Sequence, residues 1–288
     1  MRTPYFLIDE KKLVQNLEIL HGVAERAGCK ILLAQKAYSV WQTYPLIARY
    51  LAGTEASGLF EAKLGREEFG KEVHVFAPAY REEDIRQLVK IADHIVFNTP
   101  AQVRRFAPLC MEKGVSAGLR VNPECSTQEG HEIYDPCAPF SRLGTTLANF
   151  DEEMLPLLDG LHFHTLCEQN ADALAATVSA FMQKFGKYAK GMQWLNLGGG
   201  HHITRDDYDR ELLIRTVKEL REETGAQIYL EPGEAVVLNA GTLHARVLEV
   251  MKNGMDIAVL DVSAACHMPD VLEMPYRPPL FGSGKAGE

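Results

Sequence analysis

The sequence lacks a long apolar run, a paired cysteine motif and an excess of positive charge. No stretch of about eighteen consecutive apolar residues occurs, so we predict no membrane-spanning helix. The first residues, MRTPYFLIDEKKL, carry acidic side chains where a signal peptide would have its apolar core, which argues against export. The six cysteines form no CxxC pair, and this predicts free thiols in a reducing cytoplasm.

The formal net charge of −9 disfavours a nucleic-acid partner, because nucleic-acid phosphates would be repelled. The same charge suits a cationic substrate. A length of 288 residues and a hydrophobic content of 46% allow a sizeable core. We therefore expect a globular cytoplasmic protein that binds neither nucleic acid nor a membrane.

Strand and helix patterns alternate along most of the chain. Eight segments of strand type run from ILLAQ at 31–35 to QIYL at 227–230. Helices are expected over 45–51, 59–69, 81–92, 100–113, 171–190 and 207–224. Eight such units in about 210 residues predict an α/β fold, a (β/α)8 TIM-type barrel over residues 11–240. A doubly wound parallel sheet is the alternative.

Beyond residue 240 the helical pattern stops. TLHARVLEVMKN and MDIAVLDVS are typical of strands, and PYFLID near the N-terminus is typical of another. We expect residues 1–10 and 241–288 to form a small, partial β domain that includes the N-terminal strand. With so few strands and open edges, this domain is expected to be incomplete.

Polar and glycine residues follow several predicted strands at the same end of the barrel. Lys36 follows the first strand, Glu55 the second, His164 the sixth, Gly198–Gly200 the seventh and Glu231 the eighth. Barrel enzymes carry their working residues at this end. Pyridoxal phosphate is indicated by three features together: an amine, a glycine run able to bind phosphate, and a carboxylate able to face a pyridine nitrogen.

Lys36 directly follows the apolar residues ILLAQ. A buried ammonium without a partner is costly and tends to lose its proton, which makes the amine a nucleophile. A surface lysine at a strand end is the alternative. The barrel places Lys36 at a strand tip that faces an open cavity, where deep burial is not required.

Five segments resemble the fold-type III pyridoxal-phosphate decarboxylases: LLAQKAYSV, GTEASGLFEA, GLHFHTLCEQNAD, LNLGGGHHIT and YLEPGEAVV. They occur in family order and cover nearly the whole chain. Within this family, HFHTLCEQ, GGGHHIT, EPGEAV and IYDPCAP are most similar to the carboxynorspermidine decarboxylases. Ornithine and diaminopimelate decarboxylases are relatives in the same family.

The resemblance implies that Lys36 binds the cofactor covalently, that His164 stacks on its ring and that Glu231 pairs with the pyridine nitrogen. A carboxylate keeps that nitrogen protonated and so favours decarboxylation, whereas the related alanine racemases place an arginine there. Further cofactor contacts are implied for Glu55, Cys167, Gly198, Gly199, Gly200, Gly233 and Glu234. For Glu55, a solvated acid at a helix start is the alternative.

Two acidic residues differ in how they fit the family pattern. Glu234 stands where the ornithine decarboxylases read EPGR, whose arginine helps to hold the phosphate. Phosphate binding is therefore expected to depend on the glycine run, nearby backbone and Cys167. Asp270 matches the acidic position that receives the distal amine of the substrate, and a turn residue is the alternative.

The resemblance implies amine exchange at Lys36, loss of the α-carboxylate of carboxynorspermidine or carboxyspermidine as CO2, and protonation at Cα. Relatives form homodimers with shared sites and take that proton from a C-terminal cysteine of the partner subunit. No such segment occurs in these 288 residues, and Cys266 does not match it. We therefore expect the chain as given to bind the cofactor and to decarboxylate slowly or not at all.

Three alternatives remain open. The chain is a non-catalytic pyridoxal-phosphate-binding homologue, or it acts on diaminopimelate or an ornithine-like amino acid. Diaminopimelate would require an arginine for its distal carboxylate, which the expected place lacks. A metal hydrolase is the third, because His162 and His164 spell His-x-His. In amidohydrolase barrels that motif lies on the first strand, whereas here it lies on the sixth, so no metal site is predicted.

Overall fold

The computed structural model describes residues 1–128, 135–273 and 276–284, and Ile133 and Tyr134 of the IYDPCAP segment lie outside this range. The chain divides into two compact units. One is Glu10–Leu238, and the other joins Met1–Asp9 to Asn239–Glu288. Each unit is described by itself below.

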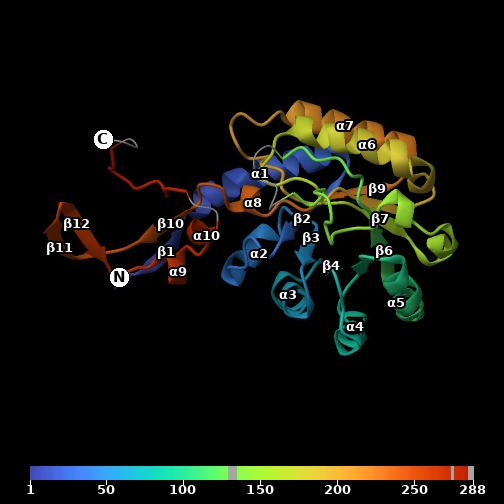
Figure 1. Ribbon diagram of the computed structural model, residues 1–288, viewed down its shortest axis with the longest axis horizontal. Helices are drawn as coiled ribbons and strands as arrows, with labels where there is room; N and C mark the ends of the chain where they lie inside the picture. The colour runs from blue at the N-terminus through green and yellow to red at the C-terminus, as the bar shows by residue number, and fades with distance from the viewer. Residues whose placement is uncertain (129–134, 274–275, 285–288) are drawn as a thin grey trace. The chain divides into compact units, whose positions relative to one another are not determined.

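The larger unit is a closed barrel of eight parallel strands, and this confirms the predicted (β/α)8 fold (Figure 1). The strands are β2 (Lys30–Ala34), β3 (Gly53–Ala56), β4 (Glu72–Phe76), β5 (His94–Phe97), β6 (Ser116–Arg120), β7 (Gly160–His162), β8 (Trp194–Asn196) and β9 (Gln227–Leu230). Neighbouring strands pair in chain order, and β2 closes the barrel against β9. All eight strands therefore end at the same mouth.

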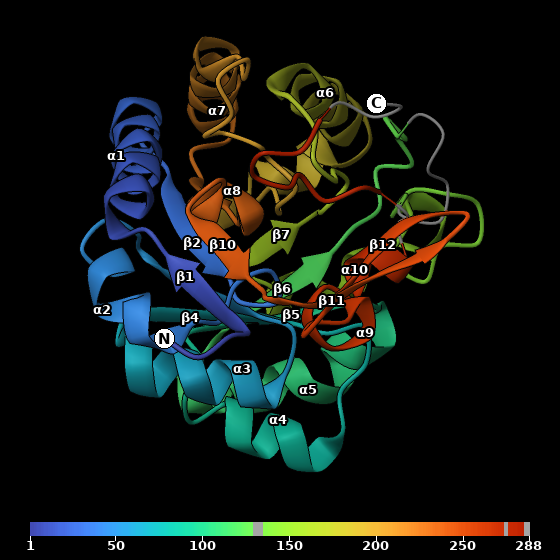
Figure 2. The same ribbon diagram turned by 90° about the vertical axis from the view of Figure 1, so that its left-hand side faces the viewer.

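Helices lie around the outside of the barrel strands (Figures 1 and 2). They are α1 (Glu10–Ala27), α2 (Tyr44–Ile47), α3 (Leu59–Leu64) with a π-helical continuation over Gly65–Phe69, α4 (Glu82–Leu88), α5 (Pro100–Lys113), α6 (Ala171–Ala189), α7 (Arg210–Thr224) and α8 (Glu234–Val237). In α1 the apolar residues Leu13, Leu17 and Leu20 are fully buried, as their helical spacing predicts.

Helix ends follow local capping chemistry. Thr99 accepts a hydrogen bond from the Gln102 backbone N–H at the start of α5, and Gly114 ends the helix in the left-handed region. The predicted helices at 45–51 and 81–92 are shorter in the structure, where α2 ends at Ile47 and α4 at Leu88. Beyond Leu88 the chain turns toward β5, because Ile91 and Ala92 both bond back to the Leu88 carbonyl.

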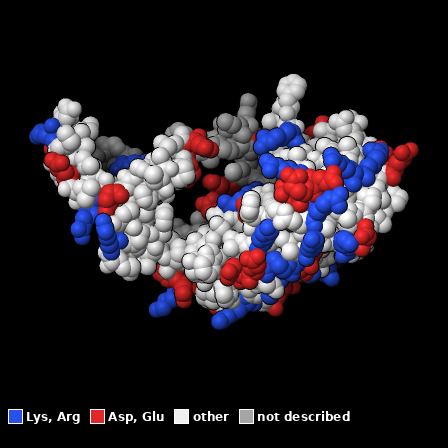
Figure 3. Space-filling view, turned by 90° about the horizontal axis from the view of Figure 1, so that it is seen from below, with Lys and Arg blue, Asp and Glu red and all other residues white. Residues whose placement is uncertain are grey.

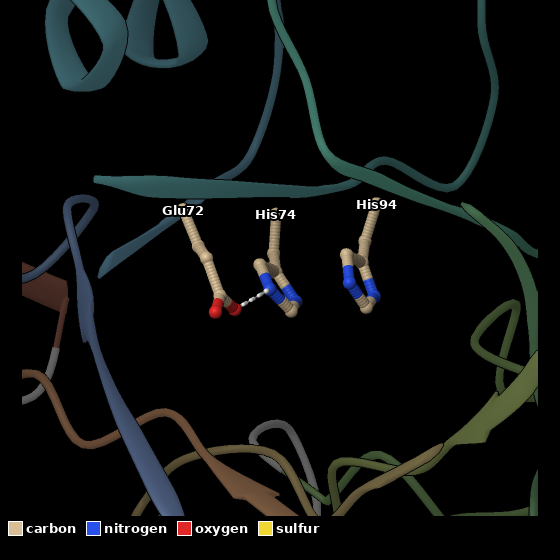
Figure 4. A group of neighbouring side chains, drawn as sticks. All are labelled: Glu72, His74 and His94. Atoms are coloured by element: carbon tan, nitrogen blue, oxygen red, sulfur yellow. Dashed lines mark hydrogen bonds and ion pairs between the residues drawn. The ribbon is translucent and has the colours of Figure 1, made fainter. Parts of the chain in front are cut away.

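Glu72, His74 and His94 lie together inside the barrel at the N-terminal ends of the strands (Figure 4). His74 Nε2 lies 3.1 Å from Glu72 Oε2, and the Lys30 ammonium lies 2.5 Å from Glu72 Oε1. Burial acts to raise the pKa of Glu72, but the hydrogen bonds from His74 and Lys30 outweigh it and lower the pKa to about 2. Although these three residues lie close enough to share a metal ion, the Lys30 ammonium on Glu72 favours a charge-paired group in the core, and the absence of a metal site stays a prediction.

The smaller unit contains two antiparallel strand pairs. β1 (Tyr5–Ile8) pairs with β10 (Gly241–His244), which confirms that the N-terminal strand joins this part of the chain. β11 (Val247–Asn253) pairs with β12 (Met255–Leu260). The segment TLHARVLEVMKN thus contributes to two strands, β10 and β11, which join different partners.

The expectation that helices stop after residue 240 was wrong. Two short helices follow the strands, α9 (Ala264–His267) and α10 (Asp270–Glu273). The Ser263 side chain caps α9 by accepting from the Cys266 N–H, a signal present in the sequence that periodicity does not detect in so short a helix.

Charged side chains of both signs are interspersed over the face shown in Figure 3, although the net charge is −9. Lysine and arginine do not gather into a basic patch on this face, as a nucleic-acid footprint would require. Among the described residues, no helix is both long enough and apolar enough to cross a membrane.

Candidate active site

A cavity of about 260 Å³ opens at the C-terminal ends of the barrel strands. Its lining includes Lys36, His164, Cys167, Gly200, Glu231 and Glu234, all of which the sequence marks as site residues. Gly233 also borders it. The barrel brings these residues together because parallel strands deliver their C-terminal residues to one mouth.

Lys36 lies in the turn that follows β2, and its side chain is exposed in the cavity. The turn is fixed by hydrogen bonds from the Ala37 and Tyr38 N–H groups to the Ala34 and Gln35 carbonyls. Gln35 itself is buried and accepts a hydrogen bond from the Tyr44 hydroxyl. Strand β2 therefore ends two residues before Lys36, whose side chain is exposed.

Glu231 follows β9 and is buried at the cavity wall. The Asn196 amide donates to Glu231 Oε1 at 2.5 Å, and His162 Nε2 lies 3.4 Å from Oε2. Burial acts to raise the pKa of Glu231, but His162 and Asn196 outweigh it, and the pKa is lowered. The carboxylate is therefore ionised at neutral pH.

Glu55 is the next-to-last residue of β3 and is buried beside the same group of charges. Burial, followed by repulsion from Glu231, raises the pKa of Glu55 to about 8, although Lys36 acts in the opposite direction. Glu55 therefore holds its proton at neutral pH. The alternative of a solvated acid at a helix start does not fit a side chain that is 4% exposed.

His164 is partly buried and lines the cavity. The Gly199 N–H donates to His164 Nδ1 at 3.1 Å, which leaves the ring proton on Nε2. Burial, together with the nearby positive charges of Lys36 and Arg120, lowers the pKa of His164 well below its ordinary value. The cavity therefore presents a neutral imidazole whose orientation is fixed by the glycine run.

The glycine run packs closely against its neighbours. A Cβ on Gly199 would lie 2.3 Å from the Glu231 carbonyl oxygen, and one on Gly200 would lie 2.1 Å from that of Leu166. Gly200 also has a φ of +80°, in the left-handed region that favours glycine. The Gly198 N–H donates to Asn196 Oδ1 and the Gly199 N–H to His164. Two of the three glycine N–H groups thus orient side chains of the site.

Cys167 and Glu234 line the cavity together with Gly200. Glu234 Oε2 lies 3.2 Å from His202 Nε2, so the acid that replaces the expected arginine is paired with a buried histidine. Burial, followed by the nearby acids Glu168 and Glu234, raises the pKa of Cys167, so its thiol stays protonated. His201 packs against the glycine run, with Nε2 3.1 Å from the Gly198 carbonyl oxygen.

Asp270 lies in the smaller unit, at the start of α10. Its Oδ2 accepts a hydrogen bond from the Tyr276 hydroxyl at 2.6 Å. Its assignment as the group that receives the distal amine of the substrate stays a prediction.

Sequence reasoning missed Arg120 and Asn196, and it read His162 only as part of a metal motif. Arg120, at the end of β6, is buried and donates to the His164 carbonyl oxygen at 2.9 Å. Burial lowers the pKa of Arg120 to about 10. The available signal was position: each of the three is the last residue of a barrel strand.

These residues fit pyridoxal phosphate. One cavity presents an exposed primary amine on Lys36, a neutral imidazole on His164 and an ionised carboxylate on Glu231. A backbone cradle at Gly200 closes so tightly that no Cβ could be added. This cofactor requires an amine that can condense with its aldehyde and a carboxylate that can hold a proton on its pyridine nitrogen. Lys36 and Glu231 supply both.

No protein-family model matches the chain. Among curated proteins, the carboxynorspermidine/carboxyspermidine decarboxylase of Campylobacter jejuni is 43% identical over 276 residues, which cover 96% of this chain and 72% of the relative. The carboxyaminopropylagmatine decarboxylase of Synechocystis is 38% identical over 283 residues, which cover 98% and 73% of the two chains.

Solved structures agree with these relatives. The crystal structure of the C. jejuni carboxynorspermidine decarboxylase complexed with norspermidine has a TM-score of 0.90 at 42% identity, covering 96% of this chain and 72% of that one. The Helicobacter pylori diaminopimelate decarboxylase, at 16% identity and a TM-score of 0.77, shares the fold. Fold and site together define a barrel decarboxylase of the fold-type III class. Within that class, the chain belongs to the carboxynorspermidine/carboxyspermidine decarboxylase family.

Proposed function

We propose that the chain is a pyridoxal-phosphate-dependent decarboxylase that converts carboxynorspermidine or carboxyspermidine to norspermidine or spermidine in polyamine biosynthesis. The observation that carries the proposal is that one cavity is lined by both the exposed Lys36 and the ionised Glu231. The family to which the chain belongs supports the substrate class. One relative has also been crystallised with norspermidine, the amine that remains when carboxynorspermidine loses CO2.

When bound, pyridoxal phosphate supplies an electron sink for the pair of electrons left at Cα as CO2 departs. Lys36 would supply the amine that holds the cofactor covalently. His164, neutral and fixed by the Gly199 N–H, offers an apolar ring face to the cofactor. Gly200 lets backbone approach the phosphate without a Cβ in the way.

Glu231 decides between reaction types. As a buried anion it holds a proton on the ring nitrogen, which strengthens the electron sink and favours loss of CO2. Glu55 contributes no second negative charge at neutral pH, because its raised pKa keeps it protonated. A carboxylate at this position, where the racemases place an arginine, supports decarboxylation over racemisation.

The test is an assay of purified protein with pyridoxal phosphate against carboxynorspermidine, carboxyspermidine, carboxyaminopropylagmatine, diaminopimelate and ornithine, with the amine products measured by mass spectrometry. We expect norspermidine or spermidine to be the product of any turnover, at the slow rate expected for the chain as given, and Lys36→Ala to abolish it. Preferred turnover of diaminopimelate or ornithine would contradict the proposed substrate. A lack of product from every substrate, with cofactor still bound, would favour the non-catalytic homologue.

We also propose a cytoplasmic homodimer with shared active sites. The support is the resemblance to fold-type III decarboxylases, together with six cysteines that are free in the structure. Sedimentation at micromolar protein concentration tests the dimer, and a monomer under those conditions would contradict it.

A further inference from the structure

Glu231 is held by side chains from two neighbouring strands. His162 is the last residue of β7 and Asn196 the last residue of β8, and the two are partners in the sheet register. Residues paired in this way point to the same side of a sheet. Both side chains are buried, with exposed fractions of 1%. Neither can move without disturbing the barrel wall, so both contacts to Glu231 come from rigid positions.

The hydrogen-bond directions in this group are fixed by chemistry. Asn196 Oδ1 accepts from the Gly198 N–H at 2.9 Å, so its amide nitrogen faces Glu231 Oε1. A carboxylate can only accept, so the His162 proton lies on Nε2, which faces Glu231 Oε2. His162 Nδ1 is buried and has no partner among the described residues. Burial also lowers the pKa of His162, so the ring stays neutral and donates only toward Glu231.

The burial of Glu231 explains why these donors matter. An ionised carboxylate removed from water is stable only when hydrogen bonds replace the water it has lost. His162 and Asn196 supply one donor to each oxygen. Without the His162 donor, Glu231 Oε2 loses this hydrogen bond, and the ionised form of Glu231 becomes less favourable. A protonated Glu231 could no longer hold a proton on a ring nitrogen.

We propose that His162 is a positioning residue that keeps Glu231 oriented and ionised toward the ring nitrogen of the cofactor, with Asn196 as the second half of the same clamp. This inference rests on the proposed function. It gives a role to a histidine that the His-x-His pattern alone would assign to a metal. It also connects Glu231 to the glycine run, because Asn196 bonds both to Glu231 and to Gly198.

The test compares His162→Leu, which removes the donor, with His162→Gln, whose amide can donate from a similar distance. Affinity is measured by reconstituting cofactor-free protein and following the visible absorbance of the bound cofactor. Each variant is titrated with pyridoxal phosphate and with its 1-deaza analogue, in which carbon replaces the ring nitrogen. His94→Leu, the same change in a histidine at the other end of the barrel, is the matched control.

We expect His162→Leu to weaken pyridoxal phosphate binding about tenfold or more, the loss typical of a hydrogen bond to a charged group. His162→Gln should restore most of that affinity. The deaza analogue should bind the wild type and both variants alike, and His94→Leu should bind pyridoxal phosphate as the wild type does.

An equal loss for pyridoxal phosphate and the analogue would overturn the inference, because His162 would then only support the fold. An unchanged affinity in His162→Leu would overturn it as well. A wild-type protein that binds no pyridoxal phosphate would overturn the proposed function itself, which separates that failure from the first two.

Discussion

Glu55 and Glu231 are two buried carboxyl groups whose surroundings move their pKa values in opposite directions. Glu231 receives hydrogen bonds and is ionised, while burial keeps Glu55 protonated. Such separation is how one site holds a permanent charge and a neutral acid at the same pH. From the sequence, both were acids at strand ends, and nothing in their neighbours along the chain distinguished them. The difference arises from Asn196 and His162, which lie 35 and 69 residues away from Glu231.

The raised pKa of Glu55 makes folding stability depend on pH. Its pKa is about 8 in the folded state against 4.5 ordinarily, so the favourable contribution is complete below about 4.5 and is lost as pH rises through 8. The free energy of unfolding of the wild type should therefore fall over this pH range by at most a few kcal/mol, the order implied by the pKa shift of Glu55. We expect no such fall in Glu55→Gln. Urea unfolding of both proteins across this range measures it.

Glu18→Gln is the control for the Glu55 prediction, because Glu18 is an exposed residue of α1. Its unfolding free energy should follow that of the wild type at each pH. If Glu55→Gln and the wild type gave parallel curves from pH 4.5 to 8, Glu55 would not carry a raised pKa.

At the scale of single elements, the loop after β8 shows what spacing can and cannot predict. A run of three glycines after the seventh barrel strand indicates close backbone approach, and the structure places Gly200 at the cavity. Which N–H groups stay available to an anion is decided by two side chains, since Asn196 and His164 take two of them. The Asn196 contact is local, two residues along the chain, whereas the His164 contact comes from 35 residues away and depends on the closed barrel.

Gly200 should be the least replaceable glycine of the run. We expect Gly200→Ala to lower the free energy of unfolding by about 1–3 kcal/mol from backbone strain, and by more from the contact with the Leu166 carbonyl oxygen. Gly225→Ala is the matched control, because Gly225 has a φ of +74° but nothing within 4 Å of a new Cβ. Thermal or urea unfolding compares them, and equal losses would mean that the close approach at Gly200 is unimportant.

At the scale of the whole molecule, the barrel was predictable because eight apolar strand patterns alternate with amphipathic helices. Once the barrel is known, Lys36, His164 and Glu231 must share a mouth. Arg120 and Asn196 were missed because a polar residue at the end of an apolar strand is expected to be solvent-exposed, and only their position at the ends of barrel strands indicated the site. In the smaller unit the pairing of β1 with β10 was predictable, whereas the break between β10 and β11 was not.

The central claim is that Lys36 is the residue that binds pyridoxal phosphate covalently. The most direct measurement is to incubate the purified protein with pyridoxal phosphate, reduce it with sodium borohydride, and locate the attached group by peptide mass spectrometry. We predict near-stoichiometric labelling of the peptide that contains Lys36, and no labelling of that site in Lys36→Ala. A label found mainly on another lysine, such as Lys30, or no label at all, would contradict the account.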